Sequence, residues 1–407
     1  VIHSMPLIAF TNKCIYCKQV DFYIDPWRPV DKAVITHGHA DHARWGNKSY
    51  LCHTLTKPIL ETRYGLYDNV QTLVYNEQID INGVKLSLFP AGHVIGSAQI
   101  RLEYKGEIAV VSGDYKTEFD GISTAFEPVK CHTFVSESTF GLPIYTWQPQ
   151  QMIFDNMASW IADNHAKNKT SVLVAYSLGK AQRLIKNLNV NCEIFVHQTI
   201  ANLNEAFANV GVDLPATTKI TAEIKKDELQ KGVVIVPPAL SDSKWVKSLI
   251  SPAIGICSGW MAVRAGRRWR SADAGFALSD HADWPGLLEA IKATEAERVM
   301  VTHGSTAVFS RYLNEIGIYA EEVKTQYGDE EAEEKVEEKQ LYTPMKRFSQ
   351  LIQELELSNK TNDKIGALVS YFSEADERDK PFVIAMFTGQ RPKRPVTTTL
   401  IKQWAIE

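Results

Sequence analysis

The segment from Ala33 to His42 holds the densest set of metal-ligand residues in the chain. Its sequence, AVITHGHADH, runs from an apolar, strand-like stretch into His37, His39, Asp41 and His42. Two imidazoles two residues apart can bind one ion, and the Asp and His of the next turn, where a helix is expected to begin, can face a second. A single histidine is usually a core residue with a satisfied hydrogen bond, but four ligand-type residues this close together are hard to explain by packing. The segment therefore predicts a site for two divalent cations.

Further ligands must come from elsewhere, because one such segment cannot saturate two ions. His93 follows an expected strand in the sequence AGHVIG, Asp114 follows another in SGDY, and His303 ends a third in VTHG. Backbone beside glycine can approach a ligand closely, and functional side chains are common where strands end. Each residue alone is more readily a satisfied loop residue, whereas together with the first segment the three form a specific pattern.

In this order the motifs resemble those of the β-CASP branch of metallo-β-lactamase-fold nucleases, which includes Artemis-type DNA nucleases and RNA 3′-end processing endonucleases. Within that branch the chain is similar to the bacterial ligase-associated exonucleases, over about residues 10–325. The resemblance implies an α/β fold, a four-layer αββα sandwich formed by residues 1–143 and 271–325. An inserted α/β β-CASP domain at residues 144–270 would cap the metal site.

The resemblance also implies a role for each motif residue. Two metal ions would be held by two groups of side chains and a bridge between them: His37, His39 and His93; Asp41, His42 and His303; and Asp114. Asp25, at the family's first motif, would orient a ligand histidine by a hydrogen bond. Zinc is the default metal for this ligand set, with manganese and iron as alternatives.

The branch-specific motifs add a candidate proton donor. Glu137 in SEST and His281 in LSDHAD match the family's acidic and histidine positions. Two ions about 4 Å apart can share a hydroxide and clamp both oxygens of an in-line displacement at phosphorus. We expect the hydroxide to lie opposite Asp114, with Asp41 also at the catalytic centre. His281 would protonate the leaving oxygen and Glu137 would hold its tautomer, the alternative being a purely structural hydrogen bond between them.

Candidate nucleic-acid contacts lie in two other segments. Residues 259–270, GWMAVRAGRRWR, combine arginines that can grip phosphate with tryptophans that can stack on bases. The candidates in this segment are Trp260, Arg264, Arg267, Arg268 and Arg270. Ser177 and Lys180 in the sequence SLGK precede an expected helix, whose N–H groups could take a terminal phosphate. A solvated basic loop and an ordinary strand–helix turn are the respective alternatives.

The elements expected to position these residues are short strands up to residue 143, then strands alternating with helices, which favours an α/β class. The expected strands are Phe22–Asp25, Ala33–Thr36, Val84–Pro90, Gln99–Tyr104, Glu107–Ser112, Thr133–Glu137, Ser171–Tyr176, Cys192–His197, Gly232–Val236, Ile254–Ser258 and Arg298–Thr302. The expected helices are Gln150–Asn168, Gly179–Asn187, Gly286–Thr294, Thr306–Ile316, Phe348–Leu357 and Lys364–Phe372.

Composition limits the class of protein. The 407 residues carry a net charge of −4, which argues against a globally basic nucleic-acid coat but not against a local basic groove. Six cysteines are too few for a disulfide scaffold and favour a reducing cytoplasm. Cys14 and Cys17 lack a second close pair for structural zinc and are expected to be plain thiols. No apolar run reaches the ~20 residues of a membrane span, and no secretory signal or membrane partner is expected.

The C-terminal part differs from the rest of the chain in its composition. An acidic linker is expected at residues 326–344, because residues 329–338 hold seven acidic side chains and one lysine. Residues 345–407 resemble the start of the N-terminal DNA-binding domain of a bacterial ATP-dependent DNA ligase, as a short helical segment. Since they end before any nucleotidyl-transfer lysine motif, no ligase activity is expected, and a ligase module fused to or associated with the chain is the implied partner.

The predicted function is that of a DNA exonuclease or end-processing nuclease in DNA repair, with DNA as partner and two divalent ions as cofactors. An RNA endo- or exonuclease of the 3′-end processing type is the alternative. The resemblance favours that alternative at one position, because Artemis-type DNA enzymes usually have Val where this chain has His303. A lactonase-like hydrolase would leave the insert, the Arg/Trp segment and His281 unexplained, and a catalytically silent scaffold would be expected to have lost ligands.

Overall fold

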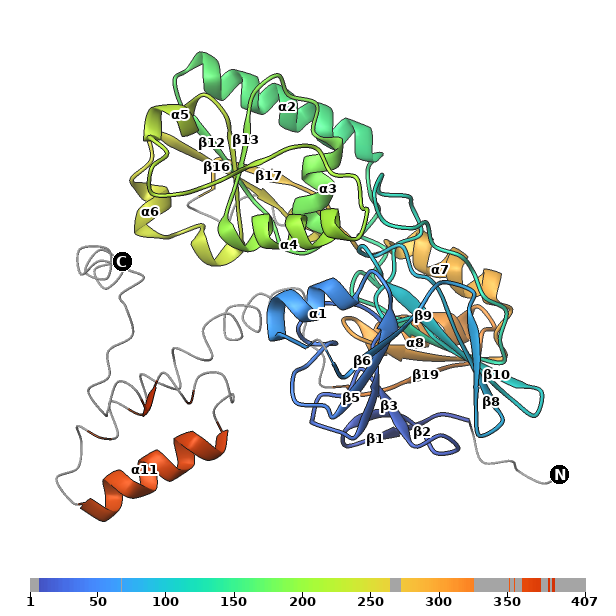
Figure 1. Cartoon of the computed structure of the whole chain (residues 1–407). Coiled ribbons are helices and arrows are strands. Elements are labelled where there is room, and N and C mark those ends of the chain that lie inside the picture. The colour runs from blue at the N-terminus through green and yellow to red at the C-terminus, as the bar shows by residue number, and fades with distance from the viewer. Residues whose placement is uncertain are drawn as a thin grey trace. The chain divides into compact units, whose positions relative to one another are not determined.

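The structure is a computed structural model of the whole chain. It describes residues 7–66, 68–263, 272–325 and 361–374, with residues 351, 355, 380, 383 and 384. The described residues divide into two compact units, one up to residue 325 and one from residue 351. Three sheets and their helices build the first unit, which confirms the prediction of an α/β class (Figure 1).

The first sheet has six strands in the order β1-β2-β3-β4-β5-β6. Their bounds are β1 Ala9–Thr11, β2 Cys14–Cys17, β3 Phe22–Ile24, β4 Lys32–Val34, β5 Ser49–His53 and β6 Val70–Leu73. β3, β4, β5 and β6 pair in parallel. The carboxyl ends of β3 and β4 therefore meet at one edge, which brings Asp25 beside the segment that begins at Ile35.

The second sheet has seven strands in the order β19-β18-β11-β10-β9-β8-β7. Their bounds are β7 Gln78–Ile81, β8 Val84–Pro90, β9 Ala98–Tyr104, β10 Glu107–Val111, β11 Thr133–Glu137, β18 Arg298–Thr302 and β19 Ala320–Glu322. β10, β11 and β18 are parallel, and β8 runs in the same direction because two antiparallel pairings separate it from β10. Residues that follow these four strands, including His93, Asp114 and His303, therefore share one edge.

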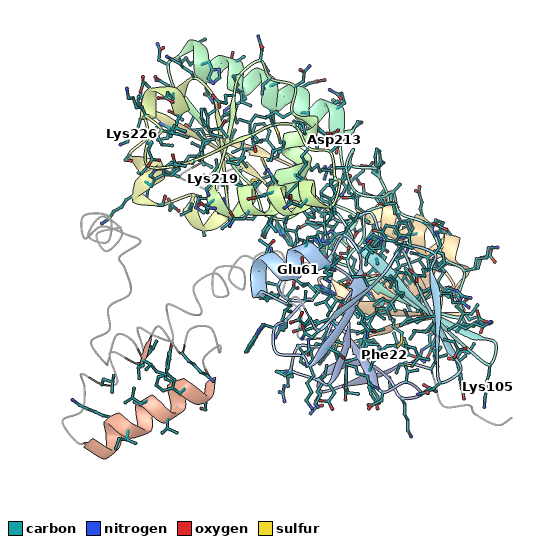
Figure 2. All side chains as sticks on the ribbon, in the orientation of Figure 1. Phe22, Glu61, Lys105, Asp213, Lys219 and Lys226 are labelled. Atoms are coloured by element: carbon teal, nitrogen blue, oxygen red, sulfur yellow. The ribbon has the colours of Figure 1, made fainter. Side chains whose placement is uncertain are left out.

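The two sheets pack face to face. Ile24 and Val34 of the first sheet share a buried apolar cluster with Leu88 and Ile100 of the second, and side chains including Phe22 fill the space between them (Figure 2). α1, Lys57–Tyr64, packs through Leu60 on the outer face of the first sheet. α7, Trp284–Thr294, and α8, Thr306–Glu315, cover the outer face of the second.

The third sheet belongs to the inserted segment and is wholly parallel, in the order β14-β13-β15-β12-β16-β17. Its strands are β12 Thr170–Val174, β13 Ile194–Val196, β14 Thr218–Lys219, β15 Val233–Val236, β16 Pro252–Cys257 and β17 Ala274–Phe276. Its helices are α2 Gln150–Ala166, α3 Lys180–Asn187, α4 Gln198–Asn209, α5 Lys226–Gln230 and α6 Lys244–Lys247, with 3₁₀ turns at Pro238–Leu240 and Gly259–Ala262. β12 and β15 are buried throughout, as parallel strands covered on both faces must be. β17 lies past residue 270, the expected end of the insert.

Most of the predicted strands and helices that fall on described residues are found at or near their expected bounds. β8 and β11 coincide with the predicted strands, and the helix expected at Gln150–Asn168 is α2, Gln150–Ala166. The prediction of a helix beginning at Asp41 and His42 is wrong. The chain makes a single turn there, with Ala43 N donating to His39 O at 2.8 Å, and then bends away at Gly46, whose φ is 103°. α1 was not predicted, because eight residues with Pro58 in the first turn carry little helical periodicity.

Within the described residues, no helix is both long and apolar enough to cross a membrane. Cys14 and Cys17 are buried cysteines, outside any disulfide, in the core between the two sheets. In the second unit, α11, Thr361–Glu374, contains the helix expected at Lys364–Phe372. The expected acidic linker at 326–344 and most of the helix expected at Phe348–Leu357 lie outside the described residues.

The acid sensitivity of the fold is expected to decrease when His53 is replaced by Phe. His53 is buried, stacks on Tyr75 with ring centroids 3.7 Å apart, and accepts a hydrogen bond from Leu55 N at Nδ1. Burial lowers the pKa of His53 to about 4. Because an unfolded histidine titrates near about 6.5, the unfolded chain binds the extra proton as pH falls below that value, and stability is lost.

At about pH 5 the free energy of unfolding is lower by about 2 kcal/mol because of His53. Urea unfolding gives the free energy of unfolding of the wild type and of His53→Phe at about pH 7.5 and about pH 5. Lowering the pH should reduce this free energy by about 2 kcal/mol more in the wild type than in the variant. The same difference between the two proteins at both pH values would contradict the prediction.

Candidate metal centre

Four buried side chains form the first ligand group: His37, His39, His93 and Asp114. Their ligand atoms all lie within 4.8 Å of one another. His39 Nδ1 is 3.1 Å from His93 Nε2, and Asp114 Oδ2 is 3.5 Å from His37 Nε2. Nitrogens bound to one tetrahedral zinc ion at about 2.0 Å lie about 3.3 Å apart. The group therefore has the spacing of ligands that surround one ion.

Three buried side chains form the second ligand group: Asp41, His42 and His303. Their ligand atoms also lie within 4.8 Å of one another. His42 Nε2 is 3.2 Å from His303 Nε2 and 3.5 Å from Asp41 Oδ2. The carboxylate of Asp114 reaches this group too, 3.5 Å from His42 Nε2 and 3.8 Å from His303 Nε2. The seven side chains that the sequence predicted as ligands thus lie together, with Asp114 between the two groups.

Two glycines let the strand ends approach this closely. Gly113, just before Asp114, has a φ of 59°, and a Cβ there would lie 2.6 Å from the side chain of Thr36. Gly304, just after His303, has a φ of 66°, and a Cβ there would lie 2.4 Å from Ser138 O. The Cβ of any other residue would force these segments apart. The positive φ would also strain the backbone of that residue.

Asp25 and Thr36 contact the ring nitrogens of His42 and His37 that face away from the metal centre, here called the outer nitrogens. Asp25 Oδ1 accepts from Thr36 N at 2.8 Å, and Asp25 Oδ2 is 2.8 Å from His42 Nδ1. Thr36 Oγ1 is 3.0 Å from His37 Nδ1. A carboxylate only accepts, so the proton of His42 stands on Nδ1 when the ring is neutral, and Nε2 is the nitrogen that can bind an ion.

The electrostatics of the centre favour neutral imidazoles in the first ligand group. Burial lowers the pKa of His37 and His39 well below the ordinary value, and lowers that of His93 to about 3. Burial also works against a charge on His42, but Asp41 and Asp114 outweigh it and raise its pKa to about 10. Burial raises the pKa of Asp114 to about 7, against the opposing charge of His42. A bound divalent ion would supply positive charge and displace the proton of His42.

The residues present fit a pair of cations, because several buried polar atoms are otherwise unsatisfied. Both carboxylate oxygens of Asp41 and of Asp114, and Nε2 of His37, have no hydrogen-bond partner within the described part of the chain. Burying unpaired carboxylates is costly unless a cation or a donor compensates them. Nitrogen and carboxylate donors of this kind suit zinc and its neighbours.

Glu137 and His281 form a third buried group with Asp114, again with ligand atoms within 4.8 Å. His281 Nδ1 is 2.9 Å from Glu137 Oε2, and Tyr115 N donates to Glu137 Oε1 at 2.7 Å. Burial would raise the pKa of Glu137, but the charge of His281 and these hydrogen bonds outweigh it and lower the pKa to about 2. Glu137 is therefore ionised and accepts a hydrogen bond from Nδ1 of His281.

The predicted nucleic-acid residues have contacts within the protein where the structure describes them. Ser177 Oγ is 3.0 Å from Thr199 Oγ1, and Lys180 Nζ is 4.5 Å from the ring centroid of Tyr176. The ring of Trp260 lies 5.0 Å from that of Phe140 in an aromatic cluster. The other candidates lie outside the described residues: Arg264, Arg267, Arg268 and Arg270.

Three contributors to the centre were not predicted. They are Thr36, the carbonyl of Leu178, which lies 3.4 Å from His39 Nε2, and the carbonyl of Asp280, which lies 2.8 Å from His93 Nδ1. Thr36 and Asp280 directly precede motif histidines, which is a usable signal. Leu178 contributes its backbone carbonyl, and a contact of this kind cannot be predicted from the type of residue.

Comparison with known proteins gives relatives of two kinds. A protein named Probable DNA ligase from Opitutus terrae is 28% identical over 321 residues, which are 78% of this chain and 31% of that protein. Endoribonuclease YSH1 of Candida glabrata is 31% identical over 121 residues, 29% of this chain and 15% of that protein. The chain thus spans a third or less of the length of these relatives, and no family model matches it.

A solved structure shares the fold alone. The crystal structure of a protein of unknown function from Enterococcus faecalis V583 superposes with a TM-score of 0.51 at 12% identity, covering 73% of this chain and 80% of that chain. The sequence relatives confirm the resemblance inferred from the motifs: the chain is homologous to a ligase-named protein and to β-CASP nucleases. With the ligand groups, they support the prediction of a nuclease.

Proposed function

We propose that the chain is a metal-dependent phosphodiester hydrolase of the β-CASP type, acting on DNA ends in a repair context linked to DNA ligation. The observation that carries this proposal is the position of Asp114 between two buried ligand groups. We also infer that residues 1–143 and 277–325 adopt the αββα metallo-β-lactamase fold and that the parallel third sheet, which includes β17, is the β-CASP insert. The order of the motifs and the packing of two sheets between α1 and the pair α7 and α8 support this inference.

The first ligand group would hold one ion and the second the other, with Asp114 shared. Bound there, two divalent ions would supply an activated water and neutralise charge on the phosphoryl oxygens. Asp25 orients the ring of His42 through Nδ1. His281, whose Nδ1 is held by Glu137, donates the proton that the leaving sugar oxygen requires.

The DNA assignment is supported by the ligase-named relative, which matches most of the chain. RNA is a second candidate, because the endoribonuclease relatives carry that activity in their names and because His303 matches the RNA-cleaving members. Both substrates need the same hydrolytic centre, so the sugar preference has to come from contacts beyond the metal ligands.

Matched single-stranded DNA and RNA oligonucleotides, each labelled at one end, test the proposal. We expect the metal-loaded protein to shorten DNA stepwise from one end and to cut RNA more slowly. Cleavage of RNA alone would overturn the DNA assignment, whereas no cleavage of either by protein shown to hold two ions would overturn the nuclease itself. The variant Asp155→Ala, on an exposed position of α2, serves as the unaffected control.

A further inference from the structure

His42 of the second ligand group is supported from within the first sheet, whereas His303 Nδ1 lies 3.2 Å from Thr302 Oγ1 of the second sheet. The outer nitrogen of His42 is held by Asp25, which follows β3, at 2.8 Å. Asp25 is itself held by the backbone and hydroxyl of Thr36, which follows β4. Asp25 and Thr36 both precede the insert in the sequence.

Two histidines of the first ligand group, His39 and His93, are supported from a different place, whereas His37 Nδ1 lies 3.0 Å from Thr36 Oγ1. His39 Nε2 lies 3.4 Å from the carbonyl of Leu178, in the turn between β12 and α3 of the insert. His93 Nδ1 lies 2.8 Å from the carbonyl of Asp280, which follows β17, the last strand of the insert's sheet. Because a carbonyl only accepts, each contact places the ring proton on the outer nitrogen and leaves His39 Nδ1 and His93 Nε2 to face an ion.

Two buried cations of α3 hold Asp280. Arg183 donates through one NH group to Asp280 Oδ1 at 3.2 Å and to the carbonyl of Ser279. Lys180 Nζ lies 3.8 Å from Asp280 Oδ2. Burial works to raise the pKa of Asp280, but Lys180 and Arg183 outweigh it and hold the pKa below its ordinary value. An ionised carboxylate between two cations fixes the backbone that carries the accepting carbonyl.

The turn that carries these groups is packed tightly against the metal centre. Gly179, with a φ of 86°, sits between Leu178 and Lys180, and a Cβ there would lie 2.4 Å from Val94, the neighbour of His93. Leu178 also shares a buried apolar cluster with Ile59 of α1 and Phe207 of α4. α1 and α4 lie side by side where the insert meets the first sheet (Figure 1).

We propose that the β12–α3 turn of the insert is a structural part of the first ligand group. Arg183 and Lys180 are positioning residues that hold Asp280, so that Asp280 and Leu178 fix the rings of His93 and His39. The inference rests on the metal centre proposed above. It follows that binding of the first ion depends on the docked insert, whereas binding of the second depends on Asp25.

The test is the stepwise affinity of the full chain for Zn²⁺ and Co²⁺, measured by chelator competition and by the visible spectrum of bound Co²⁺. Arg183→Met is expected to weaken one of two binding steps by about 10–100-fold, the range for loss of a partner behind a metal ligand. Arg183→Lys, which keeps the cation, is expected to restore most of that affinity. The variants His93→Ala and His303→Ala identify which step belongs to which group.

Asp25→Asn is the reciprocal variant and is expected to weaken chiefly the other step, because Asp25 contacts His42 directly and His37 only through Thr36. Arg101→Met removes an arginine that pairs with Glu103 on β9, away from the insert, and is expected to change neither step. If Arg183→Met does not fold, Lys180→Met provides the same comparison.

Two unaltered binding steps in Arg183→Met, or equal weakening of both, would overturn the inference while leaving the metal centre intact. Failure of the wild type to bind two ions would instead reject the metal centre, and the inference with it.

Discussion

The variant Asp114→Ala is expected to retain neither metal ion and to lose at least about 10³-fold of the hydrolytic rate. Its carboxylate faces both ligand groups, with Oδ2 3.5 Å from His37 Nε2 and 3.5 Å from His42 Nε2. Bound ions contribute several kcal/mol to a phosphoryl transition state, and each 1.4 kcal/mol changes a rate about tenfold. Elemental analysis after dialysis and initial rates on an end-labelled strand measure both effects.

The fold of this variant should persist. The carboxylate oxygens of Asp114 have no hydrogen-bond partner among the described residues, and His42, whose Nε2 lies 3.5 Å from Asp114 Oδ2, keeps Asp25 and Asp41 as partners. The substitution therefore removes the cost of burying a carboxylate without breaking a hydrogen bond. The thermal midpoint of the metal-free variant should therefore equal or exceed that of the metal-free wild type. A variant that keeps two ions and more than a tenth of the wild-type rate would contradict the bridging position of Asp114.

The variant His281→Ala is expected to lose about 10²–10⁴-fold of the rate while keeping both ions, as removal of a general acid would. Glu137, with its pKa lowered to about 2, stays ionised and accepts from Nδ1 of His281. Because Glu137 holds Nδ1, Nε2 is the nitrogen from which a protonated His281 would donate to a leaving oxygen. Metal content and rate, measured on the same preparation, test the expectation.

A substrate with a good leaving group separates this role from a metal-binding one. p-Nitrophenyl esters of nucleotides need no proton on the departing oxygen, so His281→Ala should cleave them at nearly the wild-type rate. Loss of an ion in His281→Ala would place His281 in a ligand set with Asp114, whose ligand atoms lie within 4.8 Å of its own. An equal rate loss on both substrates would also argue against general-acid catalysis.

The local elements were predictable because their signals are local. β11 ends at Glu137, two residues after its last apolar residue, Val135, and α7 begins after Asp283, whose side chain accepts from Gly286 N at 2.9 Å. The sequence predicts a helix at Asp41 because an isolated turn and the first turn of a helix have the same local residue pattern. The bend at Gly46, with its φ of 103°, brings the backbone so near Pro29 that a Cβ would lie 3.1 Å from it, and spacing along the chain does not reveal this approach.

The types of the candidate ligands could be determined from the sequence alone, because the ability of His or Asp to bind a metal ion is a property of the side chain and its immediate spacing. Only the tertiary structure decided which ring nitrogen of each histidine faces the centre. The carbonyls of Leu178 and Asp280 lie 139 and 187 positions from the histidines they contact. Such contacts use backbone atoms that every residue possesses, so the folding of the insert against the sheets, rather than any motif, brings them into place.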